Sequence, residues 1–185
     1  MKRRKWFPQH QTRREREYPK ADLCTHITGT RAASTLATHA DPVGWVLQFD
    51  GGCDFNGTAH ARGRWAYRIQ DRNRLVTKAS GPAVGSPVTN NTAEWQGLVE
   101  GLQAVGRYEP GTCPGILLIE GDSDLVISQL TGRWRAKAGP LEEWRDRALD
   151  VIAGLYVAWH ARWIPRAKND LCDAMTRLHQ AHAEG

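Results

Sequence analysis

Two short, almost continuous apolar runs in this chain are each followed by an aspartate. Residues 45–49 (WVLQF) lead directly into Asp50, and residues 116–119 (ILLI) are followed by Glu120, Gly121 and Asp122. Runs of this length and composition are typical of central strands that are buried on both faces. A carboxylate close to such a core costs free energy unless something neutralises it. The two runs therefore predict a sheet with acidic groups at the ends of its buried strands.

Two further carboxylates, Glu94 and Asp173, each lie in the first predicted turn of an amphipathic segment. Glu94 begins an apolar stripe at helical spacing that includes Leu98 and Leu102, so the periodicity turns its side chain inward. Four carboxylates that converge would repel one another strongly, and divalent cations are their natural partners. Because oxygen-only ligation suits magnesium or manganese, the pattern favours a site for one of these metals.

The remaining periodicity gives the order of the elements along the chain. Strands are expected at 43–49, 64–70, 75–80, 116–119 and 156–164, and helices at 92–107, 123–130, 141–155 and 171–183. A strand meander followed by alternating strands and helices is typical of an α/β domain with a mixed sheet and helices on its faces.

Four motifs carry the acidic residues. They are 50–57 (DGGCDFNG), 89–94 (TNNTAE), 121–127 (GDSDLVI) followed by 130–134 (LTGRW), and 163–166 (WIPR) followed by Asn169 and 172–174 (CDA). In this order and spacing they resemble the type 1 ribonuclease H family, over residues 45–178. The resemblance implies an α/β, ribonuclease H-like fold with a mixed five-stranded sheet. That sheet has a three-strand antiparallel meander plus two parallel strands, and helices cover both faces.

The resemblance also implies an activity. The catalytic residues, which are also the metal ligands, would be Asp50, Glu94, Asp122 and Asp173. They would hold two Mg²⁺ ions, for which Mn²⁺ can substitute. The enzyme would cut the RNA strand of RNA–DNA hybrids as an endonuclease, leaving 5′-phosphate and 3′-hydroxyl ends. Asp50 is expected to bridge the two ions because it would lie on the central strand.

A second set of residues is expected to contact the substrate by the same resemblance. Cys53, Asn56 and Asn91 are candidates for the RNA 2′-hydroxyl. Thr89 would contact a DNA phosphate, and Trp134, Arg135 and Lys137 would grip the DNA strand. Alternatives remain, since Asn91 fits a loop or cap and Trp134 fits a packed side chain between solvated charges. Many family members carry a histidine shortly before the last aspartate; here that segment has none, and Arg166 or Lys168 is the cation that would stand in.

Each carboxylate also has an ordinary structural explanation. Asp50 precedes Gly-Gly as turn residues do, Glu94 and Asp173 suit the positive end of a helix, and Asp122 suits an N-cap. Glu120 faces the same side as Asp122 and is expected to support the metal site from outside. Two other functions keep this fold: a DNA nuclease of the resolvase or integrase kind, and a non-catalytic nucleic-acid-binding module.

The charge of the chain is uneven. Residues 1–40 hold nine Lys/Arg and three Asp/Glu, a net +6, whereas residues 41–185 have a net charge of −1. We therefore expect a basic N-terminal extension at 1–40, either a disordered leader or a phosphate-binding arm, followed by a catalytic domain at 41–185. Four scattered cysteines without a CxxC pair fit a reducing cytoplasm, and no apolar run is long enough to cross a membrane. We expect a monomer.

Overall fold

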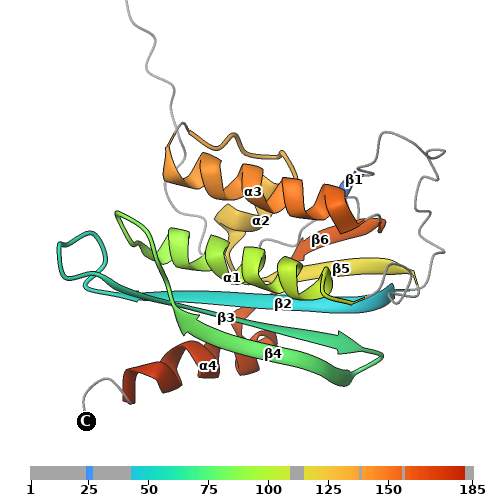
Figure 1. Cartoon of the computed structure of the whole chain (residues 1–185), viewed down its shortest axis with the longest axis horizontal. Helices are drawn as coiled ribbons and strands as arrows, with labels where there is room; N and C mark the ends of the chain where they lie inside the picture. The colour runs from blue at the N-terminus through green and yellow to red at the C-terminus, as the bar shows by residue number, and fades with distance from the viewer. Residues whose placement is uncertain (1–23, 27–42, 109–114, 138, 156, 182–185) are drawn as a thin grey trace, which may run out of the picture.

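The computed structural model describes residues 24–26, 43–108, 115–137, 139–155 and 157–181. Six strands form one sheet in the order β1-β6-β5-β2-β3-β4 (Figure 1). Their bounds are β1 Cys24–His26, β2 Val43–Asp54, β3 Arg62–Asp71, β4 Arg74–Pro82, β5 Ile116–Gly121 and β6 Trp159–Trp163. β2, β3 and β4 form an antiparallel meander, β5 is parallel to β2, and β6 is parallel to β5. This confirms the predicted meander plus two parallel strands.

The sixth strand, β1, was not predicted. Its three residues pair antiparallel with β6, so that Cys24 lies opposite Ala161 and His26 opposite Trp159. β1 falls inside the stretch expected to be an N-terminal extension, and the rest of that stretch lies outside the described residues. The domain boundary near residue 41 therefore stays a prediction, but three residues of the extension belong to the sheet.

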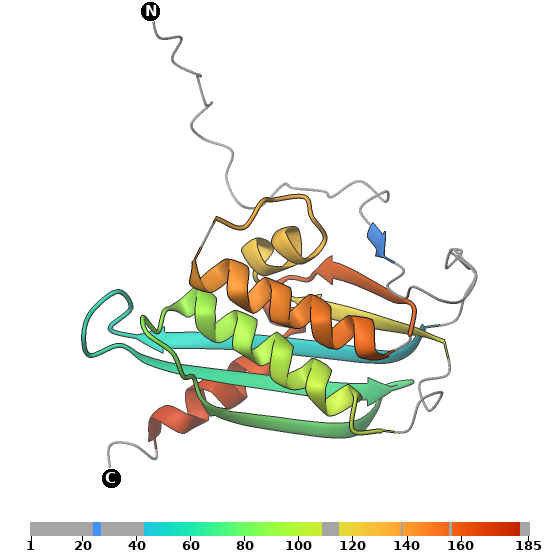
Figure 2. The same ribbon diagram turned by 45° about the horizontal axis from the view of Figure 1, so that its top comes forward.

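Helices cover both faces of the sheet, as expected. α1 Asn90–Val105, α2 Asp124–Leu130 and α3 Pro140–Leu155 lie on one face, and α4 Asp170–Ala181 crosses the other (Figures 1 and 2). A short 3₁₀ turn, η1 Arg166–Lys168, joins β6 to α4. No helix in the described part of the chain is long and apolar enough to span a lipid bilayer.

The core lies between the sheet and α1. Leu47 and Phe49 of β2 and Leu117 and Ile119 of β5 are fully buried, as expected for strands covered on both faces. Trp95 of α1 is fully buried beside them. Because the apolar runs of β2 and β5 pack in the centre, the residues that follow these runs are held in place by the core.

Two glycines let α1 lie directly on the sheet. A Cβ at Gly97 would come within 2.7 Å of the Asp50 carbonyl oxygen, and a Cβ at Gly51 would come within 2.1 Å of the Glu94 nitrogen. Real side chains do not tolerate such distances, so only glycine permits this approach. The close contact brings Glu94 of α1 beside Asp50 of β2.

The start of α1 differs from the prediction. Thr89 is the N-cap, and its Oγ1 accepts a hydrogen bond from the Thr92 backbone at 3.1 Å while the Thr92 hydroxyl accepts from the Thr89 N–H at 2.8 Å. This reciprocal capping box starts the helix at Asn90, two residues before the expected position. Glu94 therefore lies in the second turn of α1. The explanation that its charge suits the positive end of a helix was wrong.

Candidate active site

Three of the four predicted carboxylates converge beside β2. The strand continues to Asp54, so Asp50 lies within it and the turn explanation for Asp50 was wrong. Asp50 comes from β2, Glu94 from α1, and Asp122 from the turn after β5. One oxygen of each side chain lies within 4.8 Å of the others. Residues from three separate parts of the chain are thus brought to one point by the parallel pairing of β2 with β5 and by the packing of α1 on β2.

The first two of these carboxylates are strongly perturbed by burial. Burial raises the pKa of Asp50 from 3.8 to about 6; a hydrogen bond from Thr176 opposes this rise, and the negative charge of Asp122 adds to it. Burial is also the main cause that raises the pKa of Glu94 well above its ordinary value. The negative charges of Asp50 and Asp122 raise it further. A backbone N–H of Gly51 donates to Glu94 and opposes the rise, yet Glu94 Oε2 is buried without a hydrogen-bond partner among the described residues. The cluster therefore holds more negative charge than its described surroundings neutralise.

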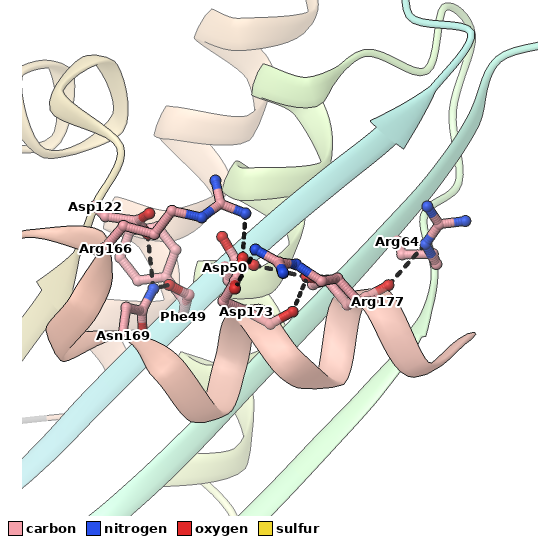
Figure 3. A network of polar contacts seen from close by, with 9 residues as sticks. Phe49, Asp50, Arg64, Asp122, Arg166, Asn169, Asp173 and Arg177 are labelled. Carbon is pink, nitrogen blue, oxygen red and sulfur yellow. Dashed lines mark hydrogen bonds and ion pairs between the residues drawn. The ribbon is translucent and has the colours of Figure 1, made fainter. Parts of the chain in front are cut away.

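Asp122 is held by its neighbours. Asn169 is fully buried, and its Nδ2 donates to Asp122 Oδ1 and to the Phe49 carbonyl oxygen, both at 2.7 Å (Figure 3). The indole N–H of Trp163 donates to the Asp122 backbone oxygen at 3.0 Å. The N-cap of α2 is Ser123, so the N-cap explanation for Asp122 was wrong. The Asp122 carboxylate is therefore not the cap of α2, and one of its oxygens lies with those of Asp50 and Glu94.

Asp173, the fourth predicted ligand, lies beside the cluster but is engaged by arginines. It stands in the first turn of α4, as expected. Its Oδ1 pairs with Arg166 and its Oδ2 lies 2.7 Å from Arg177 Nη2 (Figure 3). Its negative charge still contributes to the raised pKa of Asp50. The structure therefore brings together three of the four carboxylates and places the fourth at their edge.

Arg166 places a positive charge over the site. Its side chain is 62% exposed. Burial alone would lower the pKa of Arg166, but the carboxylates of Asp173, Asp50 and Asp122 raise it above its ordinary value. Arg166 is thus a solvent-accessible cation next to the acidic groups, whereas Lys168 is exposed and no ion pair with these carboxylates is described for it.

An open cleft of about 250 Å³ runs beside the carboxylates. Its lining residues are Gly51, Gly52, Cys53, Asp54, Arg64, Asn90, Arg166, Thr176 and Arg177. Of the predicted substrate contacts, Cys53 and Arg166 line it directly. Asn56 lies at its rim, where Oδ1 accepts a hydrogen bond from the Asn90 backbone at 3.1 Å. Asn91 is half-buried in the first turn of α1.

The other predicted contacts fall elsewhere. The Thr89 hydroxyl caps the start of α1, where it accepts a hydrogen bond from the Thr92 N–H. Thr89 is the chain neighbour of Asn90, which lines the cleft. Trp134 and Lys137 are exposed on the loop after α2 and are not part of the cleft lining; Trp134 is 46% exposed. The exposure of Trp134 does not favour the packed alternative, and its contact with the DNA strand stays a prediction.

Glu120 does not bond to the cluster. It lies in a polar row across neighbouring strands, in which Gln48 Nε2 donates to Glu120 Oε2 at 2.6 Å and Arg162 Nε donates to Oε1 at 2.8 Å. Arg68 donates in turn to Gln48. Gln48 and Glu120 each stand two residues before a carboxylate of the cluster, Asp50 and Asp122 respectively. The hydrogen bonds of Glu120 therefore hold together the strands from which these carboxylates come.

Sequence reasoning missed Thr176 and Arg64, which contact the cluster or its support, and Arg177, which pairs with Asp173. Thr176 Oγ1 lies 2.7 Å from Asp50 Oδ2, and Arg64 bonds to the backbone of Thr176. Helical spacing was the signal for the first, because Asp173 and Thr176 are three residues apart and therefore share one face of α4. No sequence signal indicated the second.

Comparisons with known proteins agree with this arrangement. The model of a family described as reverse transcriptase-like matches residues 48–179. The bifunctional protein Rv2228c of Mycobacterium tuberculosis is 31% identical over 130 residues, which cover 70% of this chain and 34% of that protein. The chain thus spans about a third of the length of this relative.

Solved structures share the fold. The crystal structure of RNase H1 from Halobacterium salinarum NRC-1 has a TM-score of 0.62 at 27% identity and covers 72% of this chain and 94% of that chain. LC11-RNase H1 in complex with an RNA/DNA hybrid has a TM-score of 0.64 at 21% identity, with the same coverage of 72% and 94%. The sequence match over most of the chain and the shared architecture lead to one conclusion: the protein belongs to the reverse transcriptase-like family, and its fold is that of the type 1 ribonucleases H.

Proposed function

We propose that the protein is a metal-dependent endonuclease that hydrolyses the RNA strand of RNA–DNA hybrids and leaves 5′-phosphate and 3′-hydroxyl ends. The observation that carries this proposal is the convergence of the buried Asp50 and Glu94 with the half-buried Asp122, with one oxygen of each within 4.8 Å of the others. A purely structural role does not account for it, because like charges this close destabilise the fold. The solved complex of LC11-RNase H1 with an RNA/DNA hybrid supports the choice of substrate.

The donor set fits a hard divalent cation. All three groups offer carboxylate oxygens, and Glu94 Oε2 is buried with no hydrogen-bond partner in the described part of the chain. We propose two Mg²⁺ ions, with Mn²⁺ as a substitute, held by Asp50, Glu94, Asp122 and Asp173, with Asp50 shared between them. Bound ions of this kind supply activation of the attacking water and stabilisation of the departing 3′ oxygen.

The arginines around Asp173 are expected to serve the substrate. Arg166 and Arg177 both line the cleft and both neutralise Asp173. A phosphodiester entering the cleft offers these guanidinium groups a second anion, and Arg–phosphate pairs are strong and often bidentate. Arg166 thereby takes the place of the histidine that many type 1 ribonucleases H carry before the last aspartate.

Recognition of ribose is assigned to the polar groups at the cleft. Cys53 lines the cleft, and Asn56 and Asn91 flank the start of α1 beside it. The Asn56 carboxamide is oriented by its bond to the Asn90 N–H, which leaves its amide donors to face solvent. Such groups can distinguish a 2′-hydroxyl from a 2′-hydrogen, which is the feature that separates RNA from DNA.

A cleavage assay with matched substrates tests the proposal. The full chain is incubated with Mg²⁺ and one sequence prepared as an end-labelled RNA–DNA hybrid, double-stranded RNA and double-stranded DNA. We expect internal cuts in the RNA strand of the hybrid only, with 5′-phosphate ends, and none after addition of EDTA. Cleavage of double-stranded DNA would favour the resolvase-like reading, and binding without cleavage of any substrate would favour the non-catalytic module.

A further inference from the structure

Thr176 of α4 reaches across to the central carboxylate. It is 4% exposed, and its Oγ1 lies 2.7 Å from Asp50 Oδ2. Its Cβ lies 3.9 Å from the position that a Cβ of Gly52 would occupy, so the side chain packs over the residue two positions after Asp50. On a strand, residues two apart face the same side. Thr176 therefore covers the face of β2 from which Asp50 projects.

The hydroxyl has one proton and two acceptors within reach. The Asp173 carbonyl oxygen lies 2.9 Å from Oγ1, and Asp50 Oδ2 lies closer. The Asp173 carbonyl is a helix acceptor with a backbone partner available four residues later, whereas Asp50 is an anion when it is ionised. Hydrogen bonds to charged acceptors are about twice as strong as neutral ones, so the proton belongs on the bond to Asp50.

Arg64 fixes the backbone of Thr176. Its Nε donates to the Thr176 carbonyl oxygen at 2.8 Å, and its Nη2 lies 2.7 Å from Asp54 Oδ2. The Arg64 side chain is only 11% exposed, and Arg64 lies opposite Gly52 in the β2–β3 register. The end of β2, the start of β3 and the middle of α4 are thus joined through one guanidinium group. Figure 3 shows the side of this link between Arg64 and α4.

We propose that Thr176, held by Arg64, is a positioning residue that fixes the rotamer of Asp50 for divalent-metal binding. This inference rests on the proposed function, because it concerns the same site. Partners that orient metal ligands in this way typically change metal affinity by about 10–100-fold when they are removed. The hydroxyl of Thr176, rather than its methyl group, carries the effect.

Four substitutions, two of them at position 176, separate the effect of the Thr176 hydroxyl from that of its methyl group. Thr176→Val keeps the shape and removes the donor, whereas Thr176→Ser keeps the donor and removes the methyl group. Thr131→Val is the matched control. Thr131 is also buried, and its hydroxyl donates to a helix carbonyl, that of Ile127 at 2.8 Å. In the sequence, Asp122 is the only proposed metal ligand near it. Arg64→Met removes the guanidinium and keeps the apolar stem.

Calorimetric titration of the free protein with Mg²⁺, and separately with Mn²⁺, gives the dissociation constants. The titration is run at pH 8, and circular dichroism confirms that each variant is folded. We expect Thr176→Val to bind about tenfold or more weakly, Thr176→Ser and Thr131→Val to stay within about threefold of the wild type, and Arg64→Met to fall between.

The outcomes separate this inference from the function on which it rests. Wild-type affinity in Thr176→Val would overturn the positioning role, and so would a Thr176→Ser variant as weak as Thr176→Val, because packing would then be the cause. A wild-type protein that binds neither ion would overturn the proposed metal site and this inference together. Tight binding by the wild type with an unchanged valine variant would overturn the inference alone.

Discussion

Replacing Asp50 by Asn is expected to stabilise the metal-free fold at neutral pH while it abolishes hydrolysis. Burial is the main cause that raises the pKa of Asp50 from 3.8 to about 6. A carboxyl with a raised pKa in the folded state contributes stability while it is protonated. That contribution is complete below pH 3.8 and is lost as the pH rises through about 6.

The size of the effect follows from the shift. Since one pKa unit corresponds to 1.36 kcal/mol, the ionised Asp50 lowers the free energy of unfolding by about 3 kcal/mol at pH 7.5 and by about 1 kcal/mol at pH 4.5. Asn keeps the shape of the side chain and an oxygen that can accept from Thr176, and its NH₂ group can donate to Asp122. The variant should therefore recover most of this free energy, or about 6–12 °C in Tm at pH 7.5.

Urea unfolding in EDTA, followed by circular dichroism at pH 4.5 and pH 7.5, measures the difference. Asp150→Asn is the matched control, because Asp150 is exposed on α3 and the same change there should alter stability little at either pH. A variant no more stable than the wild type at pH 7.5 would refute the reasoning. A gain of the same size at both pH values would do so as well.

Magnesium should reverse the order of stability. The wild type gains free energy with rising Mg²⁺ because the ion binds the folded state, and Asp50→Asn loses most of that gain. Hydrolysis of the hybrid should fall by several orders of magnitude, while hybrid binding persists because phosphate contacts dominate affinity.

Three further changes test other parts of the molecule. Asn91→Ala should weaken hybrid cleavage without creating activity on double-stranded DNA; unchanged cleavage rates would make Asn91 a helix-start residue only. Gly51→Ala should destabilise the fold by about 3 kcal/mol or more in urea unfolding, because its Cβ would meet the Glu94 nitrogen at 2.1 Å and α1 must move. Deleting residues 1–22, which keeps β1, should flatten the salt dependence of hybrid affinity by about 0.9 per lost phosphate contact in the log–log slope; equal slopes would show that this basic stretch touches no phosphate.

The central strands were predictable because their sequence signal is local. The runs in β2 and β5 are nearly all apolar, and burial on both faces is what such a run requires. The burial of Glu94 was predictable because it shares one helical face with the apolar residues Leu98 and Leu102. The convergence of Asp50, Glu94 and Asp122 was expected from the family resemblance, and the structure brings these three together.

The features that were missed depend on partners far away in the sequence. β1 is three residues long, too short for an alternating pattern, and its hydrogen bonds come from β6 more than 130 residues later. The start of α1 differs from the predicted one because the capping box of Thr89 and Thr92, and not the apolar periodicity, decides where the helix begins. The Asp173–Arg177 pair has i,i+4 spacing and was predictable, but the pairing with Arg166 depends on the turn η1.

The polar row of Arg162, Glu120, Gln48 and Arg68 has a consequence for how such sequences can diverge. Each member is in register with the next across β6, β5, β2 and β3, and Glu120 and Gln48 are almost completely buried. Loss of Arg162 alone would leave a buried carboxylate with one fewer cation, and loss of Glu120 alone would leave the Gln48 amide without its acceptor. In homologous chains these four positions should therefore change as a set, with apolar replacements arriving together and single replacements selected against. The row would then be visible as correlated substitution between four strands that no single motif connects.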